Sequence, residues 1–301
     1  MSRKDKGRKP MPHEFTDEDL RKRSQWKDIW RRLRRNKLAM VGMILVLILI
    51  VAAVFAKQLA PYDPAQQDLA HSLEMPSRAH LLGTDDYGRD ILSRIIYGGR
   101  ISLLVAILAI AFSLVMGGIL GVSAGYFGGK YDGVIMRLMD VMMAIPGFLL
   151  AVCVSSALGT GVQNTAIAIG IGCVPGYARL MRALVLSIRD QEYVEAARIT
   201  GSSDWRIMLK HIVPNILSPI IVESTLRVGA CILMISSLSF IGLGVQPPDA
   251  EWGSMLSAGR QYIRTFWPIV TFPGLAIMVT LFGFNLFGDG LRDALDPRLK
   301  R

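Results

Sequence analysis

The stretch EYVEAARITGSSDWRIMLKHIVP, from Glu192 to Pro214, is a polar, helix-forming island between long apolar runs. Its first half favours an α-helix, and Gly201 can adopt the left-handed conformation that ends one. Ser202 or Ser203 can then cap a second helix through its hydroxyl oxygen. Pro214 either ends that helix or opens the next one in its first turn. The pattern predicts a compact helix–glycine–helix elbow.

The second helix of this elbow is predicted to be amphipathic. Four apolar residues recur at i, i+3, i+4 and i+7 on one face: Trp205, Met208, Leu209 and Ile212. Arg206 and Lys210 are expected to point away from it. A large exposed aromatic side chain can fill a partner's cleft, so we expect Trp205 to be an anchor for a soluble partner. The alternatives are that Trp205 packs on its own protein or lies at the lipid surface.

Apolar runs on both sides of the elbow are long enough to cross a membrane, which takes roughly 20 mainly apolar residues per helix. Uncharged stretches cover residues 38–56, 101–129, 141–178, 228–248 and 265–288. The third stretch is long enough for two helices, broken near residues 158–161. We therefore expect an all-α integral membrane protein with six transmembrane helices and both termini on one side.

The expected spans are residues 38–60, 101–124, 134–158, 165–184, 215–241 and 265–287. Pro146-Gly147 should bend the third span and Pro175-Gly176 the fourth, because proline removes a helical hydrogen bond. Three glycines in the second span permit close approach of a neighbouring helix: Gly117, Gly118 and Gly121.

The basic residues are distributed unevenly between the two sides of this topology, in a chain of net charge +10. Residues 1–37, the elbow loop, the 130–140 loop and the C-terminal tail hold 26 Lys and Arg residues, whereas the segments 61–100 and 242–264 hold 6. Loops rich in Lys and Arg stay in the cytoplasm, so we expect both termini and the elbow to be cytoplasmic. Nucleic-acid binding would need the basic residues on one folded face, and no nucleic-acid partner is expected.

The segments between and around the spans follow from this topology. In the basic N-terminal region, we expect residues 1–24 to lack regular structure. Four apolar residues then share one face of a predicted amphipathic helix: Trp26, Ile29, Trp30 and Leu33. This helix either lies in the membrane surface, in contact with lipid, or is a basic stop that orients the first span. The remaining regions are an external segment (61–100), a five-helix core (101–291) with the elbow in its 186–214 loop, and a cytoplasmic tail (292–301).

An acidic cluster in the external segment has two interpretations. Asp85, Asp86 and Asp90 offer the oxygen ligands that calcium prefers. Arg89 lies among them, however, and the register of a calcium-binding loop is absent. We therefore expect local salt bridges and turn hydrogen bonds there, and no metal site.

Two further patterns do not indicate catalysis or cofactor binding. Gly128-Gly129-Lys130 is superficially like a phosphate-binding loop, but Ala124 and Tyr131 occupy the positions where that loop needs Gly and Ser or Thr. Three cysteines lie in apolar runs without metal-site spacing, and we expect them to be packing residues: Cys153, Cys173 and Cys231. No catalytic residue, cofactor or metal is expected in this chain.

One pair of opposite charges is predicted inside the membrane. Glu223 and Arg227 are four residues apart near the cytoplasmic part of the fifth span, and they can form an ion pair along the helix. Charges inside a membrane are costly and are candidates for function. We expect a structural role, because a self-neutralising pair is a poor proton carrier; proton transfer is the alternative.

Several motifs together resemble one family of transport proteins. Glu195-Ala196-Ala197, Gly201 and His211-Ile212-Val213-Pro214 resemble the EAA loop of ABC-importer permeases, in the form of the dipeptide, oligopeptide and nickel branch. The strings at residues 82–100, 236–253 and 288–297 are similar to the same branch. The resemblance covers roughly residues 30–301 and implies the type I ABC importer permease fold.

The resemblance also implies a function, a site and a set of partners. The chain would be the second, non-catalytic permease subunit of an importer in the bacterial inner membrane, forming a path for di- or oligopeptides with a second homologous permease as a heterodimer. The elbow would be the coupling helix that meets the ATPase, through Glu195, Ala196, Ala197, Gly201, Trp205, His211 and Pro214. Two ATPase subunits would bind ATP and Mg²⁺, and an external solute-binding protein would deliver the cargo. Nickel, glutathione or an opine-like solute are alternative cargoes.

Two other classes of protein remain open on the residues alone. An ion-coupled secondary transporter often has internal repeats and intramembrane ionisable sites, whereas this sequence has no clear repeat and one self-neutralising pair. A membrane scaffold without transport is the second class. Co-purification with two ATPase domains would distinguish an importer subunit from both.

Overall fold

The computed structural model describes residues 25–295, with the side chains of residues 29–295. The expectations for residues 1–24 and for the side chain of Trp26 lie outside this range. The longer helices are α1 (Gln25–Arg35), α2 (Lys37–Val54), α4 (Ile91–Phe127), α5 (Gly129–Met143), α6 (Gly147–Leu158), α7 (Val162–Ile188), α8 (Glu192–Ile199), α10 (Val213–Phe240), α11 (Trp252–Gly259) and α12 (Pro268–Leu295). Short helical turns complete them: α3 (Ala56–Leu59), η1 (Leu69–His71), α9 (Asp204–Ile207), η2 (Met208–Ile212) and η3 (Arg260–Tyr262).

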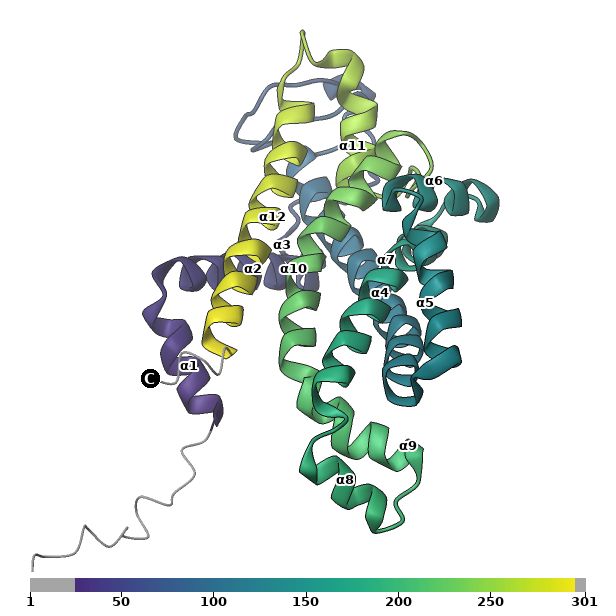
Figure 1. The fold of residues 1–301 in the computed structure, drawn as a ribbon. Helices are drawn as coiled ribbons and strands as arrows, with labels where there is room; N and C mark the ends of the chain where they lie inside the picture. The colour runs from purple at the N-terminus through teal and green to yellow at the C-terminus, as the bar shows by residue number, and fades with distance from the viewer. Residues whose placement is uncertain (1–24, 296–301) are drawn as a thin grey trace, which may run out of the picture.

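The described part of the chain contains the expected membrane helices. Five helical runs are long and apolar enough to cross a membrane: α2, α4, α7, the run Asp204–Phe240 that ends in α10, and α12. The pair α5 and α6 forms a sixth, broken span with a bend of 87°. The prediction of an all-α protein with a bundle of six spans is confirmed, and Figure 1 shows the elbow helices α8 and α9 at one end and α11 at the other.

The broken pair α5 and α6 connects opposite ends of the bundle. α5 begins directly after the end of α4, at Gly129. At the end of α6, the Ser155 hydroxyl donates to the carbonyl of Leu243, 2.6 Å away in the turn after α10, and the Gly161 amide donates to the Gly244 carbonyl at 3.2 Å. Because the turn after α10 lies far from the elbow, the pair crosses the bundle rather than returning to the side from which it started.

The bend in this span falls where proline predicts it. Pro146 precedes α6, and Gly147 lies against Gly172 of α7, where a Cβ would stand 3.2 Å from the Gly147 carbonyl oxygen. The prediction for the third span is therefore confirmed. α7 continues through Pro175 as one helix, and the bend predicted there stays a prediction.

Small residues bring α4 and α7 together along their length. A Cβ on Gly117 would lie 2.8 Å from the carbonyl oxygen of Val174, and one on Gly121 would lie 2.3 Å from that of Ala178. Backbones can approach this closely only where side chains are absent. The predicted role of these glycines is confirmed.

The buried apolar residues form two main clusters along the bundle. The larger one joins α2, α4, α7, α10, α11 and α12 and includes Ile110, Ile169, Ile232 and Trp252. The second lies at the elbow end and includes Val122, Val185, Ile207 and Ile220 from α4, α7, α9 and α10. The elbow therefore shares a core with the ends of three long helices.

The first span and α1 pack against the end of the chain. α2 contacts α12, and Gly42 allows this approach because a Cβ there would stand 2.9 Å from the Gly283 carbonyl oxygen. Leu33 of α1 is buried with Ala39 and Ala294, whereas Trp30 is exposed. The predicted helix in α1 is confirmed, but part of its apolar face packs on protein rather than facing outward.

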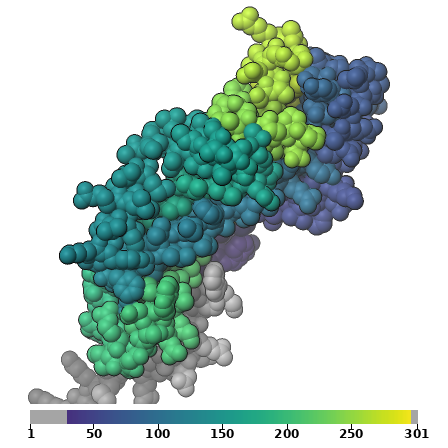
Figure 2. All heavy atoms as spheres, turned by 90° about the vertical axis from the view of Figure 1, so that its right-hand side faces the viewer, coloured from purple at the N-terminus to yellow at the C-terminus, as the bar shows by residue number. Residues whose placement is uncertain are grey.

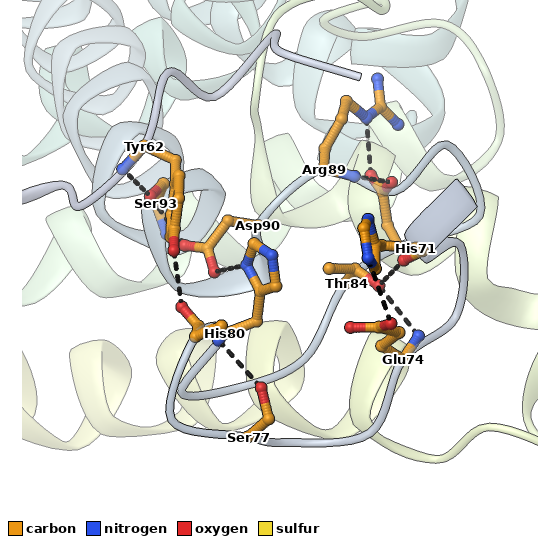
Figure 3. A network of polar contacts seen from close by, with 11 residues as sticks. Tyr62, His71, Glu74, Ser77, His80, Thr84, Arg89, Asp90 and Ser93 are labelled. Carbon is orange, nitrogen blue, oxygen red and sulfur yellow. Dashed lines mark hydrogen bonds and ion pairs between the residues drawn. The ribbon is translucent and has the colours of Figure 1, made fainter. Parts of the chain in front are cut away.

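The external segment is a folded loop held by polar contacts, drawn in Figure 3. Asp85 accepts a hydrogen bond from Arg89 Nε at 2.6 Å, and its other oxygen accepts from the Arg89 amide at 3.0 Å. Asp90 accepts from the Ser93 amide at 2.8 Å and contacts His80 Nδ1 at 3.0 Å. The predicted salt bridges and turn hydrogen bonds are confirmed.

The ionisation of this loop follows from its contacts and burial. The hydrogen bond from His71 lowers the pKa of Asp68, and the same bond raises the pKa of His71. Burial raises the pKa of the Asp86 carboxyl. Asp90 also caps α4, so this helix begins at Ile91, inside the segment that the sequence predicts to be external up to residue 100.

Candidate coupling site

The elbow is a helix–glycine–helix unit, as predicted. α8 ends at Ile199, and Gly201 follows with φ of +78°. The Ser202 amide donates to the Ala197 carbonyl and the Gly201 amide to the Arg198 carbonyl, both at 3.1 Å. This pair of bonds is the Schellman motif, which satisfies the last carbonyl groups of a helix. Ser203 precedes α9 at the cap position, but its side chain makes no capping hydrogen bond.

The second half of the elbow is continuous with a membrane helix. α9, the π-helical turn η2 and α10 form one helical run from Asp204 to Phe240, and Pro214 lies in the first turn of α10. Proline has no N–H to donate into the preceding turn, and a π turn accommodates such an interruption. Of the two predicted roles of Pro214, the opening of the next helix is the observed one.

The predicted apolar face of this second helix is partly buried and partly exposed. Met208 and Ile212 are buried in the elbow core together with Ile207, whereas Trp205 and Leu209 are exposed. Trp205, Met208 and Leu209 line one apolar groove, so the predicted face extends from the buried core of the elbow to an accessible surface. Arg206 and Lys210 are exposed, as expected.

The elbow is fixed to the end of α4 by polar contacts that the sequence does not reveal. The Tyr126 hydroxyl donates to the Asp204 carboxylate at 2.7 Å, and the Arg198 guanidinium lies 5.7 Å from the centre of the Tyr126 ring. Arg189, just after α7, donates to the Gly125 carbonyl at 2.9 Å. Because Tyr126 and Asp204 are 78 positions apart, no local pattern could predict their contact.

α8 has one buried side and one exposed side. Val194 and Ala197 are buried against the elbow core, whereas Glu195 and Ala196 of the predicted site are exposed. Ile199 is 86% exposed at the end of the helix. The sequence analysis did not predict Ile199 as a site residue. The pattern that could have indicated it is an apolar residue just before a helix-ending glycine.

The exposed side of α8 is therefore a protruding surface with apolar and acidic groups, and Tyr193 adds an exposed aromatic ring to it. Figure 2 shows the elbow as a protrusion at one end of the molecule. Exposed apolar side chains on a rigid support are typical of a docking surface.

Trp205 lies beside this surface rather than on α8. It is 65% exposed and borders an apolar groove of about 370 Å³ between the elbow, α4 and α10. Leu209, Ile119 and Leu217 line the same groove. The structure thus leaves Trp205 accessible to a partner and places it against the membrane helices. His211 is half-buried in the η2 turn.

The predicted intramembrane pair forms. Arg227 Nε lies 2.7 Å from Glu223 Oε1, and the two side chains are 31% and 29% exposed. Glu223 is ten residues, or about 15 Å, into α10, so the pair lies near the middle of this helix rather than in its cytoplasmic part. Cys173 and Cys231 are neighbours beside Arg227, and Cys231 is buried as expected of a packing residue; Cys153 is exposed.

The six-span bundle with an exposed elbow between its fourth and fifth spans is the architecture of a type I ABC importer permease. The chain belongs to the family of binding-protein-dependent transport system inner membrane components, which it matches over residues 117–301. Residues 24–76 match the N-terminal TM domain of oligopeptide transport permease C. The protein is therefore a multi-pass inner-membrane permease subunit.

Its relatives carry several transport names. The dipeptide transport system permease protein DppC of Alkalihalophilus pseudofirmus is 46% identical over 92% of this chain and 91% of its own. The di/tripeptide transport system permease protein DppC of Pseudomonas aeruginosa is 44% identical, over 92% and 93%. The glutathione transport system permease protein GsiD of Escherichia coli is 45% identical, over 92% of each chain.

Solved structures of the MetNI methionine ABC transporter, in inward facing conformations, share the fold. Two of them have TM-scores of 0.55 and 0.56 at 17% and 18% identity, and they cover 67% and 68% of this chain and 97% and 98% of their own.

Proposed function

We propose that this chain is one of two homologous permease subunits of an ATP-driven importer and that α8 transmits movement from a separate ATPase to the membrane helices. The observation that carries this proposal is the direct connection between α8 and α10. The buried side of α8 packs on Ile207, Met208 and Ile212, which belong to the continuous run Asp204–Phe240. A displacement of α8 is therefore passed to a membrane helix without a flexible linker.

The energy source and the delivery of cargo are assigned to other chains. ATP and Mg²⁺ would be bound by two ATPase subunits or domains, and this chain would hold no cofactor of its own. Gly128 and Gly129 lie at the turn between α4 and α5. The excess of Lys and Arg at the elbow end supports a cytoplasmic location for the elbow and both termini. An external solute-binding protein would meet the opposite end.

The proposed cargo is a di- or oligopeptide. Relatives that are 44% and 46% identical to this chain are named as dipeptide and di/tripeptide permeases. Glutathione is the second candidate, because a 45% identical relative is named for it. Both candidates are small molecules with free ammonium and carboxylate groups.

The test is recovery of the ATPase with a tagged copy of this chain from its native membrane. Ile199→Asp places a charge on the exposed end of α8, where it should lower ATPase recovery at least tenfold while the chain still inserts. Ile263→Asp is the matched control, because Ile263 is exposed at the opposite end, and it should not alter recovery. Trp205→Ala tests the anchor that the sequence predicts, with reduced recovery and uncoupled uptake expected.

Mass spectrometry of the recovered proteins and ATP-dependent uptake of dialanine in the same preparation give the readouts. Equal ATPase recovery with wild type and Ile199→Asp would contradict the assignment of α8. Absence of any ATPase subunit from the wild-type preparation would contradict the proposed function itself.

A further inference from the structure

A layer of polar side chains lies at the elbow-facing edge of the larger apolar cluster, to which Tyr177 itself belongs. Tyr177 of α7 donates a hydrogen bond to Ser224 of α10 at 3.1 Å, and Ser113 of α4 donates to the Gly170 carbonyl at 2.8 Å. Glu223 and Arg227 belong to this layer. It falls between Ile220 of the elbow cluster and Ile232 of the larger cluster, about halfway along α10.

The guanidinium group of Arg227 has its carboxylate contact at the Nε side. Nε faces Glu223 at 2.7 Å, and the group lies 5.1 Å from the centre of the Tyr177 ring. Gly176 leaves room for it, since a Cβ there would stand 2.9 Å from Nη2. The two terminal amino groups, Nη1 and Nη2, have no carboxylate partner within the described residues. A guanidinium whose terminal amino groups have no carboxylate partner is well suited to bind a carboxylate through two parallel hydrogen bonds.

The exposed part of this pair needs a polar environment. About a third of each side chain is accessible in this chain, and intramembrane charges almost always face the bundle interior or a water-filled cavity rather than lipid. The neighbouring part of α7 carries Gly172 and Gly176, and Gly172 contacts the bend between α5 and α6 at Gly147. Interrupted membrane helices at mid-depth are typical surroundings of a transport site.

We propose that Glu223 and Arg227 form a mid-membrane binding site for a small zwitterion. The carboxylate of the cargo binds the terminal amino groups of Arg227, and its ammonium group binds the Glu223 carboxylate. This inference rests on the proposed function and departs from the purely structural role that the sequence favours. It matches a peptide or glutathione, and it gives nickel no ligand set.

The experiment uses the whole importer with its binding protein, reconstituted in vesicles and supplied with dialanine. Arg227→Met removes the carboxylate site, and the double variant with Glu223→Gln removes both charges together. Arg227→Lys keeps the charge but loses the paired amino groups. The matched control is Asp140→Asn with Arg179→Met, an exposed ion pair between α5 and α7.

A binding site predicts that the double variant assembles and keeps ATPase stimulation by the loaded binding protein within about twofold of wild type, while its uptake falls at least tenfold. The control pair should keep wild-type uptake. A purely structural pair predicts the opposite result for the double variant. Because no uncompensated charge is left, both complex yield and uptake would be close to wild type. That result would overturn the inference. Equal loss of uptake in the control would overturn it too.

If the importer with Arg227→Met fails to assemble, the variant Arg227→Lys tests the inference instead. The binding site predicts uptake at least threefold below wild type in an assembled complex, whereas wild-type uptake overturns the inference. Failure of the proposed function is distinguishable, because the wild-type complex would then show no ATP-dependent uptake at all.

Discussion

One backbone angle, the φ of +78° at Gly201, sets the direction in which the elbow turns. No atom lies within 4 Å of the position that a Cβ would occupy there. A side chain at this position would therefore be opposed by the backbone conformation alone, with no steric clash. The chemistry of glycine makes this position predictable from the sequence, and the same holds for Pro214 in the first turn of α10.

Gly201→Val should loosen the end of α8 while the bundle stays folded. The left-handed conformation costs an L-residue about 1–2 kcal/mol, which corresponds to a factor of roughly 5–30 in the local opening equilibrium. We expect amide hydrogen exchange in residues 192–202 to accelerate by that factor. Gly201→Asn should have a smaller effect, since Asn enters this conformation more readily. Wild-type exchange in the valine variant would show that the turn does not restrain α8.

Other residues of the site depend on neighbours that the sequence does not place. Ile199 is exposed because nothing packs over the end of α8, and Tyr126 matters because α4 ends beside Asp204. Trp205 and Met208 line one groove, but Met208 is buried and Trp205 is exposed, a difference set by the neighbouring helices. Side-chain chemistry could predict the turn, but not which side of each helix the bundle covers.

At the scale of elements, the contact between α4 and α7 holds together the two helix ends against which the elbow packs. Gly117 and Gly121 let the two backbones meet, and Gly125 continues the contact against Val185 at the elbow end. Small residues at short spacing could be predicted from the sequence as a packing face. The 87° bend between α5 and α6 could be anticipated at Pro146, but not its size.

Gly121→Ala should destabilise this contact, because its Cβ would stand 2.3 Å from the Ala178 carbonyl oxygen and 2.9 Å from the Ala178 Cα. Overpacking of this kind costs about 1–3 kcal/mol or more. Gly274→Ala is the matched control: its Cβ would meet nothing within 4 Å, and alanine favours a helix over glycine. We expect a lower thermal midpoint of the purified subunit for the first variant and not for the second. Equal midpoints would contradict the close contact.

At the scale of the whole molecule, the distribution of Lys and Arg along the chain is consistent with the order of the membrane helices. The long apolar runs could predict the six-span bundle, and the Lys and Arg counts its proposed orientation. The sequence could not predict that the mid-membrane pair lies at the elbow-facing edge of the larger apolar cluster, because the clusters are assembled from helices distant in the chain. In this arrangement one core holds the elbow to α4, α7 and α10, and under the proposed function this core would pass movement of α8 toward the polar layer.

The most direct test of this account is photocrosslinking from position 199 in living cells. A photoreactive phenylalanine analogue replaces Ile199, the end of the exposed helix α8, and mass spectrometry identifies the protein attached to it. The account predicts a crosslink to an ATP-binding subunit, formed at position 199 and not at position 263 of the opposite end, which is also exposed. A crosslinked product without an ATPase, or an ATPase attached at 263 instead, would contradict the central claim that the elbow couples ATP hydrolysis to the membrane helices.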